Sequence, residues 1–315
     1  MQHILVTGGA GFIGSHLVEA LLKLQYKVIV IDNFDTFYSR SIKEENIRSY
    51  INDPECTFLE ADICDESVYT KLAKYKIDCI VHLAAKAGVR PSIENPLEYE
   101  RVNIRGTQLL LEFAQMNKIA KFVMASSSSV YGINKNFPWS ESDHVLKPIS
   151  PYAATKLSTE FIGNVYSELY DINFCALRFF TVYGPRQRPD LAIHKFIKKL
   201  LNNEAIDVYG NGDTLRDYTY VDDIVEGIIG AINYNQTKYE IFNLGNSDCI
   251  SLSELLECIE KEFDKKFIMN RLPQQKGDAP KTFADITKAK KLLGYNPQTK
   301  ITEGISKFKN WIVNQ

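Results

Sequence analysis

Three glycines, each three residues from the next, separate an apolar run from a helical pattern near the start of the chain. Gly8, Gly11 and Gly14 lie between the apolar residues 4–7 and the amphipathic stretch 12–24. Glycine at such positions allows a tight turn and brings backbone N–H groups close to a pyrophosphate at the helix N-terminus. A glycine cluster alone is weak evidence. Its place between a strand and a helix predicts a dinucleotide-binding unit built on parallel strands.

A carboxylate at the end of the second expected strand indicates which dinucleotide binds. Asp32 directly follows the strand expected at residues 27–31, which is apolar from Val28 to Ile31. A carboxylate there accepts hydrogen bonds from ribose hydroxyls and repels a 2′-phosphate, which favours NAD over NADP. Asp62 follows the third strand and is expected near the adenine edge. An ordinary strand-end turn residue is the weaker interpretation of Asp32.

Short apolar strands and helical patterns alternate through the first half of the chain, and this alternation predicts an α/β fold with a doubly wound parallel (Rossmann) sheet. Further strands are expected at residues 57–59, 79–83, 121–125 and 174–178, with helices at 66–74, 97–117 and 151–170. After residue 180 the pattern changes, and helices are expected at 192–201, 221–233, 252–263 and 286–293. We therefore expect an NAD-binding domain over residues 1–180, with returning segments near 214–246, and a smaller mixed α/β lobe over 181–315. Residues 37–50 lack a clear period and are expected to form a solvated connection.

Charge and cysteine usage exclude several function classes. The 37 Lys and Arg against 39 Asp and Glu give a formal net charge of −2, which argues against nucleic-acid or polybasic membrane partners. The six cysteines contain no CxxC pair, and no apolar run approaches the ~20 residues of a membrane span. The chain enters its first strand directly after Met1, so we expect a cytoplasmic protein without a leader. His82 and His194 pair into no metal site, and no metal is expected.

A phenol, an ammonium and a row of serines supply the reactive groups. Tyr152 and Lys156 are four residues apart, just inside a helix, so both side chains lie on one helical face. A phenol has an ordinary pKa of about 10 and becomes a usable base when an ammonium and the positive nicotinamide ring stabilise its phenolate. Serines 126–129 follow a strand, at the edge where open α/β sheets bind ligands. Alone these would be a surface pair and a polar turn; with the glycine turn they predict one reactive site.

Together these motifs resemble the extended short-chain dehydrogenases/reductases, specifically the nucleotide-sugar epimerases, over essentially the whole chain. The resemblance is carried by residues 7–14, 82–85, 125–132, 152–156, 178–185, 216–218, 221–223, 243–245 and 277–278. It implies that Ser127 lies beside the sugar O4, that Tyr152 is the base with Lys156 as its partner, and that Ser128 assists in the same pocket. It implies NAD as cofactor. The expected NAD-binding residues are Gly8, Gly11, Phe12, Ile13, Gly14, Asp32, Asn33, Asp62, Ile63, Leu83, Ala84, Ala85, Tyr152 and Lys156.

The segment after residue 178 is similar to UDP-glucuronate 4-epimerases. The common hexose epimerases have Arg-Tyr-Phe-Asn where this chain has Arg178-Phe179-Phe180-Thr181. A uronate presents a carboxylate at C5, to which Thr181 can donate a hydrogen bond and Arg188 a bidentate fork. The resemblance also assigns residues to the UDP portion of the substrate, with Arg186 left as a solvated loop residue. Those residues are Ala192, Lys195, Tyr209, Arg216, Asp278 and Gln275, although some relatives have an arginine at the last position. Arg90 is expected either to contact the phosphates of the cofactor or of the substrate, or to be a surface residue.

The implied reaction moves the C4 hydride to NAD⁺ and returns it to the opposite face of a 4-keto sugar, so NAD is recycled. The alternatives are a UDP-glucose/galactose or UDP-N-acetylhexosamine 4-epimerase, a UDP-glucuronate decarboxylase, and a non-catalytic NAD-binding regulator. A 4,6-dehydratase is disfavoured, because its relatives have Asp-Glu where this chain has Ser128-Ser129. The resemblance also implies a homodimer formed through the helices at 97–117 and 151–170.

Overall fold

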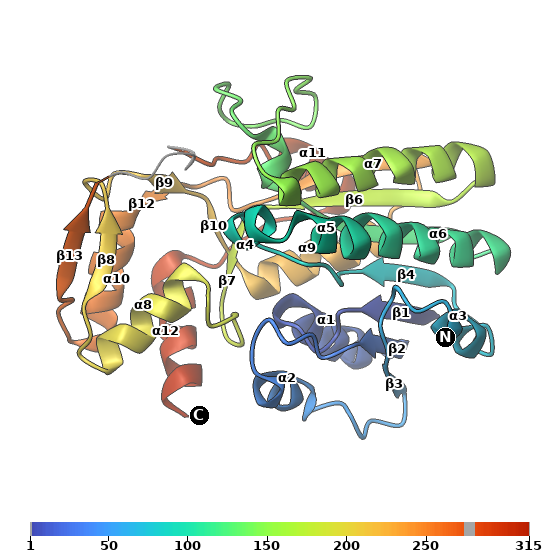
Figure 1. Cartoon of the computed structure of the whole chain (residues 1–315), viewed down its shortest axis with the longest axis horizontal. Coiled ribbons are helices and arrows are strands. Elements are labelled where there is room, and N and C mark those ends of the chain that lie inside the picture. The colour runs from blue at the N-terminus through green and yellow to red at the C-terminus, as the bar shows by residue number, and fades with distance from the viewer. Residues whose placement is uncertain (1, 274–280, 315) are drawn as a thin grey trace.

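A seven-stranded, fully parallel sheet forms the centre of the molecule (Figure 1). The computed structural model describes residues 2–273 and 281–314. In spatial order the strands are β11 (Tyr239–Leu244), β6 (Asn173–Phe179), β5 (Lys121–Ser127), β4 (Cys79–His82), β1 (His3–Thr7), β2 (Lys27–Asp32) and β3 (Cys56–Glu60). The strand order changes direction between β1 and β4, which opens a crevice at their carboxyl ends. The predicted doubly wound parallel sheet is confirmed.

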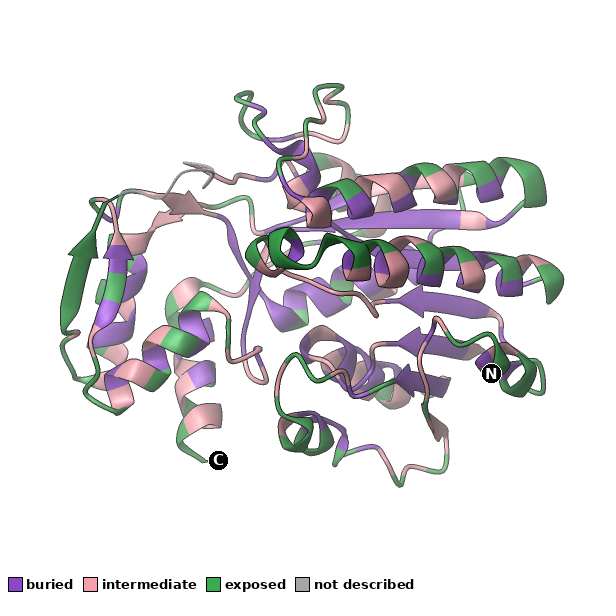
Figure 2. Cartoon of the chain, in the orientation of Figure 1, coloured by how far each residue is buried: buried purple, intermediate pink, exposed green. Residues whose placement is uncertain are grey.

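Helices cover both faces of this sheet, so its strands are apolar on both sides. Ile4, Val6 and Val28 pack into one core, and Leu5 and Ile29 into the other. The first core is closed by α1 (Phe12–Lys23), α2 (Arg40–Ile47), α9 (Val221–Asn233) and α11 (Thr287–Leu293), the second by α3 (Ser67–Leu72), α6 (Gly106–Met116) and α7 (Pro151–Tyr170). Figure 2 shows the buried strands and the exposed outer faces of α6 and α7. Among the described residues, no helix is both long and apolar enough to cross a membrane.

A second group of elements lies beside the carboxyl ends of the sheet (Figure 1). It contains α8 (Ala192–Leu201), β8 (Ile206–Tyr209), β9 (Leu215–Arg216), β12 (Ile250–Ser251), α10 (Leu252–Phe263), β13 (Met269–Leu272) and α12 (Ile301–Val313). β13 pairs with β8 in parallel, and β12 pairs with β9 in antiparallel fashion. A parallel pair between β7 (Thr181–Tyr183) and β10 (Tyr218–Tyr220) connects this group to the end of β6. The crevice therefore has walls from both halves of the chain.

The predicted helix over residues 97–117 is present but not uniform. It consists of α5 (Pro96–Tyr99), a π-helical segment Glu100–Arg105 and α6, and it follows the short helix α4 (Val89–Glu94). One extra residue per turn in such a segment redirects side chains, and π-segments are frequent at functional sites. Here the π-segment places Asn103 in the buried interior, next to the loop that follows β4.

The prediction that residues 37–50 form a solvated connection is wrong, because they contain α2. The buried face of this helix includes Lys43 and Asn46, so it has no apolar stripe that a periodicity argument could detect. Asn46 instead donates to the Ala10 carbonyl at 3.0 Å, and the hydroxyl of Tyr50 donates to the Gly9 carbonyl at 2.8 Å. Helix α2 is thus held against the glycine turn by polar contacts.

Candidate functional site

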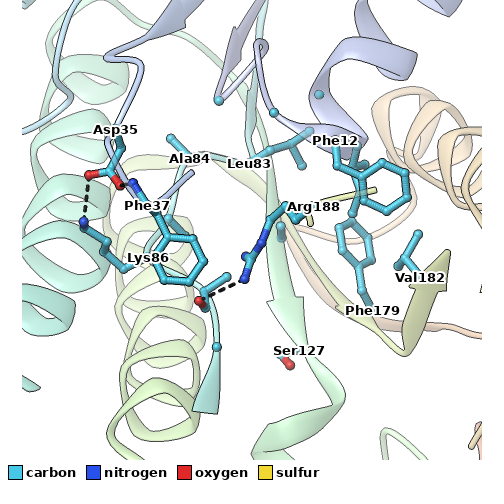
Figure 3. Close-up of a pocket in the computed structure, with 18 of the residues that line it drawn as sticks. Phe12, Asp35, Phe37, Leu83, Ala84, Lys86, Ser127, Phe179, Val182 and Arg188 are labelled. Carbon is cyan, nitrogen blue, oxygen red and sulfur yellow. Dashed lines mark hydrogen bonds and ion pairs between the residues drawn. The ribbon is translucent and has the colours of Figure 1, made fainter. Parts of the chain in front are cut away.

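A cavity of about 500 Å³ lies in the crevice at the carboxyl ends of the central strands (Figure 3). Most of the predicted site residues line it: Gly8, Gly11, Phe12, Ile13, Gly14, Asp32, Asn33, Asp62, Ile63, Leu83, Ala84, Ala85, Ser127, Tyr152, Lys156, Thr181, Arg188 and Ala192. These residues come from the ends of β1, β2, β3, β4 and β5, from the first turns of α1 and α7, and from the segment around β7 and α8. The sheet topology therefore brings together residues that lie far apart in the sequence.

The glycine turn has the geometry of a pyrophosphate cradle. Gly8 has φ of +76°, and a Cβ on it would come within 2.7 Å of the Ala84 backbone nitrogen. A Cβ on Gly14 would come within 2.1 Å of the Gly8 carbonyl oxygen. Helix α1 begins at this turn with no acidic residue in its first turn, so its N–H groups and positive dipole end are suited to an anion. These features fit the diphosphate of NAD.

Asp32 lies at the end of β2 and is held in place by backbone amides. Its Oδ2 accepts from the Ala10 N–H at 3.1 Å, and its Oδ1 accepts from the Phe34 N–H at 2.9 Å. Burial raises the pKa of Asp32, while nearby Lys43, with Nζ 3.8 Å from Oδ1, and these amide bonds oppose the rise. Beside it, the Asn33 amide donates to Asp62 at 3.1 Å. The carboxylate and amide groups on this side of the cavity suit ribose hydroxyls and an adenine edge.

Ser127, Tyr152 and Lys156 also line the cavity, and they come from β5 and α7, not from the glycine turn. Ser127 ends β5, and Tyr152 lies in the first turn of α7, whose N-cap Ser150 accepts from the Ala153 N–H at 3.2 Å. Lys156 lies one turn further along α7, and its buried Nζ donates to the Ala125 carbonyl at 2.7 Å. The cap and the strand carbonyl fix the helix register relative to β5, and so the relative positions of hydroxyl, phenol and ammonium.

The titration behaviour of this group reflects its burial. Burial raises the pKa of Tyr152, whereas the hydrogen bond with Ser127 and the positive charge of Arg188 act to lower it. Burial lowers the pKa of Lys156 to about 8, opposed by Glu160 one turn further along α7. The phenol thus needs further positive charge to ionise near neutral pH, and the oxidised nicotinamide ring is one source.

A buried ion pair supports the strand end from below. Arg178 of β6 donates to both carboxylate oxygens of Glu160, at 3.0 and 2.8 Å, and both side chains are at most 2% exposed. Ser126 donates to the same carboxylate at 2.5 Å. Glu160 therefore connects β5, β6 and α7 at Ser126, the residue before Ser127.

Lys86 lines the cavity and Asn103 holds its backbone from behind, and neither was predicted from the sequence. The Asn103 carboxamide accepts from the Lys86 N–H at 2.8 Å, and donates to the Lys86 carbonyl at 3.0 Å and to Thr155 Oγ1 at 3.0 Å. The Lys86 ammonium reaches Asp35 at 2.7 Å. Neither residue belongs to a local sequence pattern, because the π-segment and the β4 loop meet only in the folded chain. His82, by contrast, is buried between Thr7 and Thr107, with ring-to-hydroxyl distances of 2.7 and 2.9 Å, in agreement with a structural role.

Arg188 enters the cavity from the loop after β7 and is already paired. Its Nε and Nη2 donate to the two carboxylate oxygens of Asp190, at 2.9 and 2.7 Å. Burial lowers the pKa of Arg188, but the hydrogen bonds and charge of Asp190, together with Tyr152 and Tyr38, raise it overall, so the guanidinium stays charged. Thr181, at the start of β7, also lines the cavity. The lining thus combines a hydroxyl and a charged fork with Ser127 and Tyr152.

Of the other predicted substrate residues, five that the structure describes lie outside this cavity lining: Arg90, Ser128, Lys195, Tyr209 and Arg216. Ser128 begins a short 3₁₀ turn, and Lys195 is exposed on α8. Arg90 places its guanidinium 6.0 Å from the centre of the Tyr209 ring, linking α4 to β8. Arg216 of β9 donates to the Leu215 carbonyl at 2.9 Å. Gln275 and Asp278 lie outside the described residues.

Comparison with known proteins gives matches along the whole chain. The family model described as GDP-mannose 4,6 dehydratase matches residues 5–308. A UDP-glucuronate 4-epimerase of Thermodesulfobacterium geofontis is 40% identical, and the match covers 99% of this chain and 96% of that protein. Family membership and overall architecture are therefore shared over essentially the full length.

Solved structures of epimerases superimpose closely on the present one. The UDP-glucuronic acid 4-epimerase from Bacillus cereus, in complex with UDP-glucuronic acid and NAD, is 38% identical and has a TM-score of 0.93, with 99% of both chains covered. The UDP-N-acetylglucosamine 4-epimerase from Methanobrevibacter ruminantium M1, in complex with UDP-N-acetylmuramic acid, is 33% identical and has a TM-score of 0.92, with 100% and 99% covered. Both neighbours act on UDP-sugars.

Proposed function

Because this chain belongs to the GDP-mannose 4,6-dehydratase family of extended short-chain dehydrogenases/reductases, we propose that it interconverts UDP-glucuronate and UDP-galacturonate by C4 epimerisation with bound NAD. The observation that carries the proposal is the placement of Arg188 and Thr181 in one cavity with Ser127, Tyr152 and Lys156. A neutral hexose has no use for a guanidinium beside C5, whereas a uronate carboxylate does.

The chain's own groups would move the proton of the sugar O4. The glycine turn and Asp32 would hold NAD, which would supply a reversible hydride acceptor for the sugar C4. Tyr152 as phenolate accepts the O4 proton, while Ser127 hydrogen-bonds the same oxygen and keeps it directed at the phenol. The Lys156 ammonium stabilises the phenolate electrostatically. Once the 4-keto sugar has rotated to present its other face and has been reduced again, Tyr152 returns the proton to the O4 alkoxide.

A uronate places a second demand on the site. The 4-keto uronate is a β-keto acid and is poised to lose CO₂. Hydrogen bonds from Thr181 and Arg188 to the carboxylate keep its charge localised on the oxygens, which slows C–C cleavage. These two residues thus separate epimerisation from decarboxylation as well as contributing affinity.

The neutral and N-acetylated sugars remain the second candidate class. One structural neighbour carries the name of a UDP-N-acetylglucosamine 4-epimerase, and its overall fold is as similar as that of the uronate enzyme. A 4,6-dehydratase activity is disfavoured, because Ser128 and Ser129 follow Ser127. A pure NAD-binding regulator has no need of the Ser127, Tyr152 and Lys156 arrangement.

Product analysis decides among these activities. The purified protein is incubated separately with UDP-glucuronate, UDP-glucose and UDP-N-acetylglucosamine without added NAD, and products are identified by chromatography. UDP-galacturonate from the first substrate is the expected result, and a pentose nucleotide would indicate decarboxylation instead. Turnover confined to a neutral sugar would transfer the assignment to the second class.

We propose further that two copies of this chain form a homodimer and that the protein is cytoplasmic. Three apolar residues on the outer stripe of α7, Phe161, Val165 and Leu169, are 50–67% exposed, and Met116 of the neighbouring helix α6 is exposed too, an arrangement suited to a symmetric helix-to-helix dimer contact. Residues 1–180 would hold NAD, and 181–315, with segments near 214–246 returning to the first domain, would hold the UDP-sugar.

All six cysteines are free within the part of the chain that the structure describes, which is in keeping with a reducing cytoplasm.

A further inference from the structure

The loop between β2 and α2 lines the cavity, and an ion pair joins it to the loop that follows β4. We refer to residues 35–38 of this loop as the clasp. One carboxylate oxygen of Asp35, Oδ2, pairs with the Lys86 ammonium at 2.7 Å (Figure 3). The other, Oδ1, accepts from the N–H of Phe37 at 3.0 Å. Because Asn103 holds the Lys86 backbone on both sides, the clasp is tied to a fixed point of the NAD-binding half.

At the tip of the clasp, Phe37 lies against Arg188. The centre of the phenyl ring is 4.8 Å from the Arg188 Cζ, within the range of a cation–π contact, and Figure 3 shows the ring beside the guanidinium inside the cavity. Phe37 remains 39% exposed, so it is not part of a hydrophobic core. Packing within the loop therefore does not explain an aromatic residue at this position.

The remaining contacts of Arg188 direct its guanidinium toward protein acceptors, not toward a substrate. Asp190 engages Nε and Nη2, and the Ala87 carbonyl accepts weakly from Nη2 at 3.4 Å. Asp190 is a carboxylate, so it competes with a substrate carboxylate for the same charge. A neutral ring can hold the guanidinium plane while leaving its positive charge and N–H donors available.

We propose that Phe37 is a positioning residue that aligns Arg188 for the C5 carboxylate of a uronate. The inference rests on the proposed function, since it concerns the same carboxylate. It adds that selectivity for the uronate depends on a residue of the cofactor-side loop, which Asp35 and Lys86 hold in place.

The test measures binding in a Tyr152→Phe background, where no turnover occurs, with saturating NAD. Phe37→Ala should weaken UDP-glucuronate binding by about 3- to 20-fold, the range expected for loss of a partly desolvated cation–π contact. UDP-glucose binding should change less than about 2-fold, since that sugar makes no use of the charge. Phe37→Leu should resemble Phe37→Ala, and Phe37→Tyr should restore the wild-type ratio of the two dissociation constants. Tyr75→Ala, at an equally exposed aromatic position remote from the cavity, is the matched control.

A double-mutant cycle identifies the partner. In an Arg188→Ala background, Phe37→Ala should have no further effect on the ratio of the two dissociation constants. Equal weakening of both nucleotides, or an undiminished effect without Arg188, would overturn the inference. Failure of the proposed function has a different signature: the wild-type protein would form no UDP-galacturonate at all.

Discussion

Arg188 and Asp190 meet through two parallel N–H···O bonds of 2.9 and 2.7 Å at the wall of the cavity. An acidic substrate that uses Arg188 must therefore share or displace a carboxylate already present. A neutral sugar gains nothing by displacing Asp190 from Arg188, whereas a ligand with its own negative charge replaces the ion pair that is lost. Selectivity against neutral sugars follows from the pair rather than from the arginine alone.

Arg188→Ala should weaken UDP-glucuronate binding far more than UDP-glucose binding. Removing a charge-assisted hydrogen bond costs about 1.5–3 kcal/mol, or roughly 10–150-fold in apparent affinity. Calorimetric titration of both nucleotides measures the two changes. A diphosphate contact would weaken both equally and a solvated arginine neither; each pattern would return a neutral-sugar epimerase to first place.

The protein should purify with NAD(H) bound, because a cofactor that is regenerated in each cycle does not need to leave. Acid release followed by an enzymatic NAD assay gives the occupancy. Gly8→Ala should lower that occupancy sharply, since its Cβ would collide with the backbone at Ala84. Gly294→Ala is the matched control, because that glycine also has a positive φ but no atom within 4 Å of the added carbon. Equal occupancy in both variants would contradict the assigned cradle.

Tyr152→Phe should abolish turnover and leave ligand binding nearly intact. The phenyl ring preserves the packing of α7 but removes the proton acceptor, and loss of a general base costs about 10²–10⁴-fold in rate. Product formation and calorimetric binding are measured on the same preparation. Turnover near the wild-type level would exclude Tyr152 as the base.

Turnover should decline as the pH rises through about 8. The pKa of Lys156 is lowered by burial to about 8, so its ammonium is lost above that pH and no longer stabilises the phenolate. Stability moves the other way. Between this pKa and the ordinary value of 10.5, the unfolded chain binds more protons at this group than the folded one, so its contribution to the unfolding free energy rises with pH. Activity that keeps increasing to pH 10 in folded protein would contradict this assignment.

Phe161→Asp should convert a dimer into a monomer. The substitution places a charge in the exposed apolar stripe of α7, where it would be desolvated in the proposed contact. Light scattering after size exclusion gives the mass of each species. Tyr75→Ala, outside this stripe, should leave the mass unchanged. A wild-type monomer at micromolar concentration would refute the dimer.

Local patterns predicted the parts of the site that depend on neighbouring residues. Gly8 and Asp32 mark the ends of β1 and β2, and Tyr152 and Lys156 lie on one face of α7, one turn apart, so spacing alone indicates their placement. Helix α2 escaped prediction because Lys43 and Asn46, two of its three buried residues, are polar, and Ile47 alone forms no apolar stripe. Phe37 and Asn103 escaped because their roles depend on contacts between segments far apart in the chain.

Arg178 and Glu160 form a buried pair behind Ser126, here called the floor of the site, and this pair limits how the floor can change during evolution. Losing either partner alone would leave an uncompensated charge beside Ser126 and cost about 3–5 kcal/mol, a large part of a typical domain's stability. Replacing both with well-packed apolar residues can be nearly neutral. Variation is therefore expected to be easy at the cavity rim, around Asp190, and to require simultaneous paired changes at the floor, so new sugar specificities would arise from the rim.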